Sequence, residues 1–352
     1  MKVVVFGLGV SSAWGNGHAT LWRGLLGALA RDGHDATFYE RDVPYYARTR
    51  DLAAGSGWDL VLYPSWAEIE ERARRDLGAA DAAIVTSYCP DAQAASDLVL
   101  AARTTRVYYD LDTPVTLEAL ARGDEVAYLP RQGLGGFDLV LSYTGGAALE
   151  ALRTTLGARR VAPLFGSVDL RVHAPAPPSG AFAGCDLSYL GTYAADRQAG
   201  VEALFLEVAR RMPAHRFALG GPMYPDDVAR PANVAWRPHV APGDHPAFYG
   251  SSRVTLNVTR RSMAALGHCP SARLFEAAAC GVPLVSDAWE GLDRFFEPGH
   301  EILVARSTDD VVEALRRDPE DLRAIADQAS RRTREEHTAE RRARELVALL
   351  GS

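Results

Sequence analysis

The amino-acid sequence predicts an α/β protein built from two doubly wound, parallel-sheet, Rossmann-like domains that face each other across a cleft. Three observations lead to this prediction. The 352 residues suit two domains of ordinary size better than one. Short apolar runs alternate with segments of helical periodicity, which is typical of parallel sheets covered by helices on both faces. A stretch rich in Pro, Ala and Gly, residues 170–185, interrupts this alternation, which then restarts.

In the first half, the predicted strands are short apolar runs, and the predicted helices repeat apolar residues at helical spacing. The first strand is "KVVVFGLGV", and the first helix, "ATLWRGLLGALARDGH", ends near Gly33. The other segments are strands over residues 36–42, 81–89, 106–112, 137–144 and 160–168, with helices over 91–105 and 145–158.

The second half repeats this alternation and ends in a charged helix from about Pro319 to Leu350. Its predicted strands cover residues 186–193, 216–222, 233–240, 254–259, 282–287 and 301–305, with helices over 197–213, 245–252, 272–281 and 309–317. We therefore place an N-terminal domain at residues 1–170, a linker at 171–185 and a C-terminal domain at 186–330. We expect the last helical part, residues 331–352, to pack back on the N-terminal domain.

The composition excludes several classes of enzyme. The chain is 47% hydrophobic and 24% charged, as in ordinary globular proteins, and its net charge of -7 argues against a nucleic-acid partner. Of its 38 basic residues, only Lys2 is a lysine. Since Lys2 precedes the first strand and no "GK[ST]" occurs, pyridoxal phosphate enzymes, Walker-type ATPases and protein kinases are poor interpretations. Arginines, helix ends or backbone amides must then hold any bound phosphate.

The chain start and the cysteines indicate a cytoplasmic protein. The first residues lack the charge and cleavage pattern of a signal peptide, and no apolar run is long enough to span a membrane. The four cysteines are scattered, without a C-x-x-C pair, so neither a disulfide framework nor a zinc site is expected.

The loop after the first strand, "GVSSAWGNGHA", carries the first candidate site residues. Gly15 and Gly17, on either side of Asn16, allow the backbone to approach a ligand closely, and the helix end that follows favours an anion. The loop does not have the G-x-G-x-x-G pattern of nicotinamide-binding proteins. His18 lies at the start of the helix, where it could act as a base, bind a hydroxyl or phosphate, or simply cap the helix.

A second strand-to-helix loop, "YDLDTPVT", holds Asp110, Asp112 and Thr113. Asp112 followed by Thr113 and Pro114 is typical of a helix start, so capping is as good an interpretation as a sugar contact or a catalytic base.

In the second half, "YLGTYAADRQAG" follows the first strand. Gly191 and Thr192 make a tight exit from that strand, and Arg197 could place its guanidinium on a phosphate. A single arginine at a helix start is more often solvated.

The segment "LNVTRRSMAALGHCPSARLFEAAACGVPLVSD" is the richest in chemistry. A strand ends at Arg260 and Arg261, and Ser271 is a natural N-cap for the next helix, so that helix end and two arginines form an anion site. Glu276 lies inside this helix among apolar residues, where an unpaired carboxylate would be costly. Either Arg273 satisfies it, or a ligand does, such as the vicinal diol of a ribose.

"SARLFEAAACGVPLVSD" resembles the signature of the C-terminal domain of GT-B glycosyltransferases. Together with "WGNGHAT", "YDLDTPVT", "LSYTGGAALEAL", "YLGTYAADRQ", "LNVTRRSMAALGHCPSARLFEAAACG" and "FFEPGHEILV", it resembles the spore-maturation-protein CgeB-like family of glycosyltransferases. The resemblance spans about residues 1 to 330. It implies a GT-B architecture, with the acceptor bound on the N-terminal side and the nucleotide sugar bound by the C-terminal domain.

The resemblance also implies roles for particular residues of the donor site. Glu276 would bind the ribose, and Arg197 would contact the diphosphate. Arg260 or Arg261, together with the amides around Ser271, would share the charge of the diphosphate.

On the same grounds, backbone near His239 and Val240 would recognise the base. The loop Gly15–His18 would close on the donor from the N-terminal side. Retaining relatives often carry a second glutamate eight positions before the ribose glutamate, and His268 occupies that position here. We still favour retention of configuration.

We therefore expect a hexosyl- or N-acetylhexosaminyl-type transferase that uses a UDP-sugar by analogy, without a metal or other cofactor. His18 or Asp112 would handle the acceptor proton, and closure about the linker would exclude water. Two alternatives stay open: a nucleotide-sugar 2-epimerase, and a non-catalytic nucleotide-sugar-binding protein. An assay without acceptor distinguishes an epimerase from a transferase, since an epimerase would change the sugar of the donor. Turnover with any acceptor excludes the second.

Overall fold

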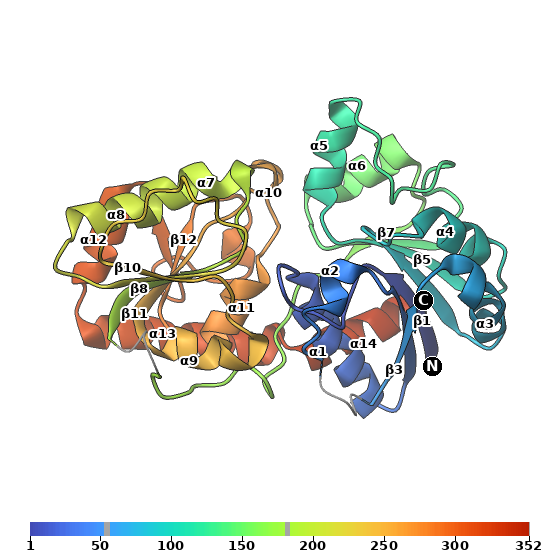
Figure 1. The fold of residues 1–352 in the computed structure, drawn as a ribbon, viewed down its shortest axis with the longest axis horizontal. Helices are drawn as coiled ribbons and strands as arrows, with labels where there is room; N and C mark the ends of the chain where they lie inside the picture. The colour runs from blue at the N-terminus through green and yellow to red at the C-terminus, as the bar shows by residue number, and fades with distance from the viewer. Residues whose placement is uncertain (53–56, 180–183, 352) are drawn as a thin grey trace. The chain divides into compact units, whose positions relative to one another are not determined.

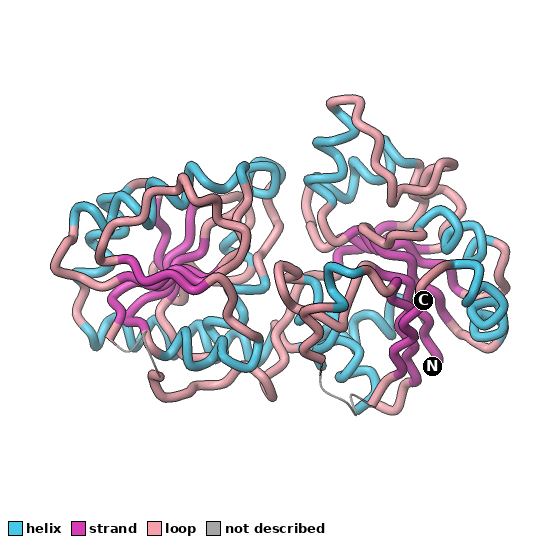
Figure 2. The backbone as a smooth tube through the Cα atoms, in the orientation of Figure 1, coloured by secondary structure: helices cyan, strands magenta, loops and turns pink. Residues whose placement is uncertain are grey.

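The computed structural model describes residues 1–52, 57–179 and 184–351. The chain forms two compact units. Unit 1 comprises Met1–Phe165 together with Ala339–Ser352, and unit 2 comprises Gly166–Thr338. In each unit, the strands form a central layer with helices packed on both sides (Figure 2). Both halves are therefore α/β, as the alternation of strand and helix patterns predicts.

The sheet of unit 1 is parallel and has the order β3-β2-β1-β4-β5-β6-β7 in the described part of the chain. Val3 of β1 pairs with Ala36 of β2 on one side and with Ala82 of β4 on the other. The strand order thus reverses between β1 and β4, which is where open sheets of this kind bind ligands. The strands are β1 (Lys2–Gly7), β2 (Asp35–Arg41), β3 (Asp59–Tyr63), β4 (Ala82–Thr86), β5 (Thr105–Asp110), β6 (Leu139–Ser142) and β7 (Val161–Pro163).

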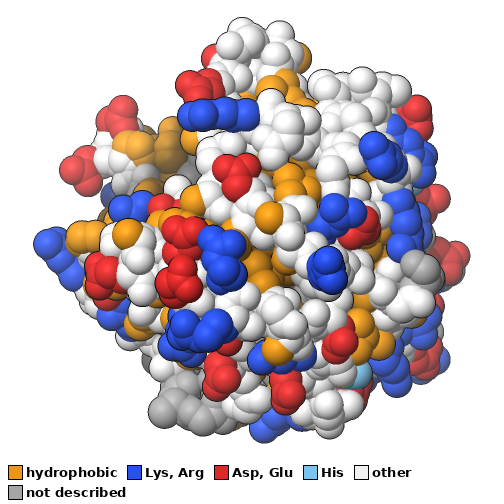
Figure 3. Space-filling view, turned by 90° about the vertical axis from the view of Figure 1, so that its right-hand side faces the viewer, with side chains coloured by type: hydrophobic (Ala, Val, Ile, Leu, Met, Phe, Trp, Pro, Cys, Tyr) orange, Lys and Arg blue, Asp and Glu red, His pale blue; other side chains and the backbone are white. Residues whose placement is uncertain are grey.

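Helices cover both faces of this sheet. Figure 1 shows α1 (His18–Arg31) beside α14 (Ala339–Leu350) on one face, and α3 (Trp66–Gly78) with α4 (Ala92–Leu100) on the other. The remaining helices of unit 1 are α2 (Pro44–Ala47), α5 (Thr113–Ala121) and α6 (Ala147–Leu156). Acidic and basic side chains are interspersed over the face of the molecule seen in Figure 3.

Unit 2 repeats the same topology, with the parallel order β10-β9-β8-β11-β12-β13 among the described residues. Its reversal lies between β8 and β11. The strands are β8 (Cys185–Leu190), β9 (Phe217–Gly220), β10 (Val234–Arg237), β11 (Ser252–Asn257), β12 (Leu284–Asp287) and β13 (Leu303–Ala305). Both sheets therefore have the strand order of doubly wound, mononucleotide-binding folds.

The helices of unit 2 also lie on both faces of its sheet (Figure 1). The predicted helix over residues 197–213 is continuous but changes form, because a π-helical turn, Glu202–Leu206, separates α7 from α8. Ser307 and Asp310 form a capping box at the start of α12. The helices are α7 (Ala195–Val201), α8 (Glu207–Arg211), α9 (His245–Gly250), α10 (Arg261–Leu266), α11 (Ala272–Ala279), α12 (Thr308–Arg316) and α13 (Pro319–Glu336).

The prediction of a single charged helix from about Pro319 to Leu350 is wrong, because the chain leaves the helical path at His337 and Thr338. The His337 ring packs on that of Phe275, with centroids 4.5 Å apart. The backbone N–H of Val168 donates to the carbonyl oxygen of His337 at 3.0 Å. These contacts hold His337 at φ -124° and end α13, so the following helix, α14, is a separate element that belongs to unit 1.

Residues 171–185, which we expect to be a linker, fall within unit 2, and residues 180–183 lie outside the described part of the chain. The side chain of His173 is buried, and the Ser179 N–H donates to Ser251 Oγ at 3.2 Å. No helix in the described ranges is long and apolar enough to cross a membrane.

Candidate functional site

In unit 1, the loops after β1 and β5 carry the predicted site residues. β4 lies between these two strands in the sheet, and the loop that follows it leaves the same edge. Because the carboxyl ends of parallel strands meet at one edge, these loops converge at the position where the strand order reverses.

A buried carboxylate fixes the loop after β1. Glu40, at the end of β2, is 0% exposed and accepts hydrogen bonds from the backbone N–H groups of Val10 (2.7 Å) and Ser11 (2.8 Å). The Ser11 hydroxyl donates to the other carboxylate oxygen at 2.5 Å. Sequence reasoning missed this residue, although a glutamate at the end of an otherwise apolar strand is the signal that could have revealed it.

Asn16 holds the second part of the same loop. Its buried side-chain amide donates to the carbonyl oxygens of Gly9 (2.9 Å) and Ser12 (3.3 Å), and its Oδ1 accepts from the His18 N–H at 3.2 Å. Gly15 has φ +63°, which favours glycine. Asn16 therefore stabilises the conformation of the loop. Gly17 is the N-cap of α1.

The structure brings His18 and Asp112 together. Nε2 of His18 lies 3.8 Å from Oδ2 of Asp112, and both side chains are partly exposed, at 22% and 14%. The Tyr88 hydroxyl donates to the same Oδ2 at 2.9 Å, and its ring stacks on the His18 ring at 5.8 Å. Both of the predicted catalytic residues thus lie at one position, with Tyr88 as a third member that sequence reasoning missed.

Asp110 holds the backbone of Asp112 in place. It is fully buried, and its Oδ1 accepts a hydrogen bond from the Asp112 N–H at 3.1 Å. Burial raises the pKa of Asp110 to about 6, against the lowering effect of neighbouring hydrogen-bond donors. This carboxyl group is therefore partly protonated near neutral pH.

In unit 2, the exit from β8 requires glycine. The Gly191 N–H donates to the carbonyl oxygen of Gly220 at 2.8 Å. A Cβ at Gly191 would lie 2.8 Å from the Tyr189 hydroxyl and 2.9 Å from Nη2 of Arg273. The guanidinium of Arg197 turns back and donates to the carbonyl oxygen of Thr192. Gly191, Thr192 and Arg197 thus form one compact turn.

The two arginines after β11 have different surroundings. Nε of Arg260 donates to both carboxylate oxygens of Asp196, at 3.1 and 3.0 Å, which links the loop after β11 to the start of α7. Arg261 is the exposed first residue of α10. Ser271 is the N-cap of α11, as predicted from its place before the helix.

One interpretation of the sequence expected Arg273 to satisfy Glu276. In the described structure, Arg273 does not hydrogen-bond Glu276. Its guanidinium donates to the carbonyl oxygen of Leu190 and, at 2.6 Å, to Oδ1 of Asn257. It also lies over the Tyr189 ring, 5.2 Å from the centroid. Arg273 therefore joins α11 to β8 and β11.

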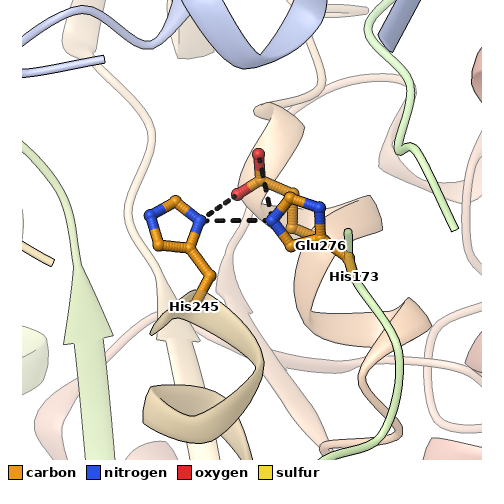
Figure 4. A group of neighbouring side chains, drawn as sticks. All are labelled: His173, His245 and Glu276. Carbon is orange, nitrogen blue, oxygen red and sulfur yellow. Dashed lines mark hydrogen bonds and ion pairs between the residues drawn. The ribbon is translucent and has the colours of Figure 1, made fainter. Parts of the chain in front are cut away.

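Two histidines flank Glu276 instead (Figure 4). Nε2 of His173 lies 3.9 Å from Oε1 of Glu276, and Nδ1 of His245 lies 3.7 Å from Oε2. His245 also contacts the carbonyl oxygen of Val240 through Nε2, at 3.2 Å, next to the half-buried His239. Sequence reasoning missed both histidines: His173 lies in the predicted linker, and His245 begins a short helix.

The electrostatic surroundings keep Glu276 ionised. Burial by itself raises its pKa, but His173, His245 and Arg273 outweigh that effect and lower the pKa to about 2. Burial lowers the pKa of His173, so its ring is neutral near pH 7. A buried carboxylate is thus ionised beside a neutral imidazole and can accept hydrogen bonds from ligand hydroxyls.

At the position where retaining relatives often carry a second glutamate, His268 adopts a left-handed conformation with φ 47°. Its N–H donates to the carbonyl oxygen of Glu290 at 2.7 Å, and its ring packs against Gly291, where a Cβ would lie 2.2 Å from Nδ1.

The two-unit fold is that of the GT-B glycosyltransferases. Residues 197–348 match the family model described as "Glycosyl transferase-like". No curated protein matches the chain in sequence.

Solved structures resemble the chain over its whole length. Sucrose-phosphate synthase from Thermosynechococcus elongatus is 14% identical, with a TM-score of 0.73 over 99% of this chain and 98% of that one. Anabaena HepE in complex with UDP and glucose is 13% identical, with a TM-score of 0.70 over 100% of both chains. An alpha-glucosyltransferase in complex with UDP and a 13-mer DNA containing a HMU base is 12% identical, with a TM-score of 0.74 over 100% of this chain and 99% of that one. At these identities the similarity establishes the fold, while the closer resemblance to the CgeB-like family stays a prediction.

Proposed function

We propose that this protein is a glycosyltransferase that moves a hexosyl or N-acetylhexosaminyl group from a UDP-sugar to an acceptor. The observation that carries the proposal is the buried, ionised Glu276 on α11, with its carboxylate between two histidines. The match of residues 197–348 to a glycosyl transferase-like model supports it. Neighbours of the same fold that bind UDP support the choice of nucleotide.

The donor lies in unit 2, with its ribose on Glu276. A carboxylate accepts two hydrogen bonds from adjacent hydroxyls, as the 2′ and 3′ positions of a ribose provide. The diphosphate lies by Arg197, Arg260 or Arg261 and the amides that follow Ser271, where helix-end dipoles and guanidinium groups stabilise anionic oxygens. To bind phosphate, Arg197 must leave the Thr192 carbonyl.

The nucleobase of the donor contacts the backbone near His239 and Val240. The Val240 carbonyl oxygen lies 3.2 Å from Nε2 of His245, whose Nδ1 lies 3.7 Å from Glu276. His245 therefore connects the two parts of the site that would bind the base and the ribose.

The acceptor proton is handled in unit 1 by His18, which acts as the base, with Asp112 orienting its ring. The 3.8 Å separation of Nε2 and Oδ2 allows Asp112 to stabilise the imidazolium that forms when His18 takes the proton. The Tyr88 hydrogen bond to Asp112 holds the carboxylate in place.

Stabilisation of the leaving diphosphate by arginines and helix ends makes the transfer itself independent of a metal. We propose that the reaction proceeds with retention at the anomeric carbon.

A thermal-shift titration with UDP, dTDP, GDP, CDP and ADP tests the donor site. Saturation at about a hundredfold the Kd adds about 2.7 kcal/mol to the free energy of unfolding. We expect UDP to stabilise the wild type and Glu276→Gln to abolish the effect. Glu313→Gln, an exposed glutamate on α12, is the matched control and keeps it. Stabilisation of Glu276→Gln equal to that of the wild type would remove Glu276 from the donor site.

A further inference from the structure

Three side chains from distant segments converge on one point of unit 2 (Figure 4). His173 comes from the segment after β7, His245 begins α9, and Glu276 lies in the middle of α11. Their side chains are only 3%, 12% and 8% exposed. Nε2 of His173 lies 3.2 Å from Nδ1 of His245, and all three potential ligand atoms lie within 4.8 Å of one another.

The hydrogen bonds decide which atom of each side chain faces this point. A carbonyl oxygen can only accept, so Nε2 of His245 donates a hydrogen bond to the Val240 carbonyl oxygen. Nδ1 of His245 is then the ring nitrogen that faces Nε2 of His173 and the Glu276 carboxylate. A carboxylate oxygen of Glu276 completes the set of potential ligand atoms.

The spacing suits a small divalent ion. Zn²⁺ binds imidazole nitrogens at about 2.0–2.1 Å, so two ligands of a tetrahedral site lie roughly 3.3 Å apart. The two histidine nitrogens, at 3.2 Å, already have this separation. The carboxylate oxygens, at 3.7 and 3.9 Å from those nitrogens, need only a small rotation of the Glu276 side chain.

We propose that His173, His245 and Glu276 form a binding site for a divalent transition-metal ion such as Zn²⁺. The set of two histidines and one glutamate is one that zinc uses when a fourth position is open to solvent or ligand. The Val240 carbonyl supports His245 from the outside, as carbonyl groups do for metal-bound histidines.

Without the ion, one proton joins the two rings, donated by Nε2 of His173 to Nδ1 of His245. Metal binding transfers that proton to Nδ1 of His173, which is buried and has no hydrogen-bond partner in the described structure. The affinity is therefore lower than that of a site in which both histidines have an outer partner.

This site has a consequence that rests on the proposed function. An ion bound by Glu276 occupies the carboxylate that we assign to the ribose, so the metal and the nucleotide compete. Divalent transition metals are then inhibitors of a transfer that needs no metal.

Isothermal titration with Zn²⁺ alone, on full-length protein without a polyhistidine tag, tests the site. We expect one ion per chain, and binding weakened more than about 100-fold in His245→Ala and in Glu276→Gln, since the loss of an outer partner alone costs about 10- to 100-fold. His300→Ala changes an exposed histidine of the same unit and should bind like the wild type. Absence of binding, or equal binding by the wild type and His245→Ala, overturns the proposal.

The competition is tested by measuring the Kd of UDP with and without saturating Zn²⁺. We expect Zn²⁺ to raise the Kd in the wild type and to leave the ratio of the two values near one in His245→Ala. Zn²⁺ binding with an unchanged Kd of UDP overturns the competition and leaves the metal site standing. Zn²⁺ binding to a protein that binds no nucleotide contradicts the proposed function alone.

Discussion

At the scale of single residues, ionisation states decide what each candidate group can do. Glu276 and Asp110 are both buried carboxyl groups, but their pKa values move in opposite directions, to about 2 and about 6. Burial raises both pKa values. Two histidines and an arginine outweigh this effect at Glu276, whereas at Asp110 burial remains the largest effect, with a smaller contribution from the like charge of Asp112. The charge of a buried carboxyl group therefore depends on the balance between burial and its neighbours.

His18→Ala is expected to lower the transfer rate by about 10²- to 10⁴-fold, the usual contribution of a general base. The Kd of UDP should stay near the wild-type value, because the proposed nucleotide contacts lie in unit 2. Steady-state turnover and a UDP titration measure the two effects. His34→Ala, the other histidine of unit 1 near this helix, serves as the control. A transfer rate unchanged by His18→Ala would remove His18 from the mechanism.

Asp110 makes stability depend on pH with a definite sign. Its pKa is raised in the folded state, so between about pH 4 and pH 6 the folded chain holds a proton that the unfolded chain has lost. The contribution of Asp110 to the free energy of unfolding is therefore greatest below about pH 4. It falls by roughly 3 kcal/mol as the pH rises to about 6.

Thermal unfolding of the wild type and of Asp110→Asn across this pH range measures the effect. The Tm of the wild type should fall relative to that of the variant as the pH rises from about 4 to about 6. A constant difference between the two Tm values would show that Asp110 titrates as an ordinary carboxyl group.

At the scale of elements, the loops at the carboxyl ends of the strands are fixed from within. Glu40 holds the loop after β1, and Gly191 allows the turn after β8 to pass between Tyr189 and Arg273. These loops are therefore shaped before a ligand arrives, which reduces the entropy lost on binding.

Gly191→Ala should disturb the donor site through sterics alone. The added Cβ lies within 3 Å of two side chains that are themselves packed, so the turn must shift, at a cost of about 1–3 kcal/mol. We expect weaker binding of UDP and a lower Tm. Gly243→Ala is the control, because a Cβ there meets nothing within 4 Å. Equal effects of the two substitutions would contradict the packing argument.

Most strands and helices could be predicted from the sequence, and the reasons for the failures are physical. β3 and α3 were missed, because β3 lies at the edge of the sheet with an irregular burial pattern and α3 buries only Ile69, Ala73 and Leu77. His18 and Asp112 could each be predicted from the loops that carry them, as alternatives, but the structure alone shows that their side chains lie 3.8 Å apart. The neighbours of Glu276 did not, because His173 and His245 reach it through tertiary packing of segments without a local signal.

At the scale of the whole chain, the two units have the same strand order, and unit 1 is completed by the last helix of the chain. The buried residues of α14 include Ala343 and Leu346, and this helix packs on α1. The buried Arg342 guanidinium donates to the carbonyl oxygen of Phe165 at 3.2 Å and to Glu345 at 3.0 Å. Residues from both ends of the chain thus form one core.

Leu346→Ala should destabilise unit 1 by about 2–5 kcal/mol, because the side chain is only 1% exposed and its removal leaves a cavity. Hydrogen exchange should speed up in peptides of unit 1 much more than in peptides of unit 2. Leu349→Ala, on the half-buried side of the same helix, is the milder control. Faster exchange in both units to the same extent would contradict the assignment of α14 to unit 1.

The place of α14 also sets an order for biosynthesis. The strands of unit 1 leave the ribosome first, but the helix that covers α1 is translated only after all of Gly166–Thr338. At about 5–20 residues per second, those intervening codons take roughly 10 to 35 s. During that time the face of α1 that packs on α14 stays uncovered, and chaperones can bind it. A truncation that removes α14 would therefore destabilise the unit whose strands are translated first.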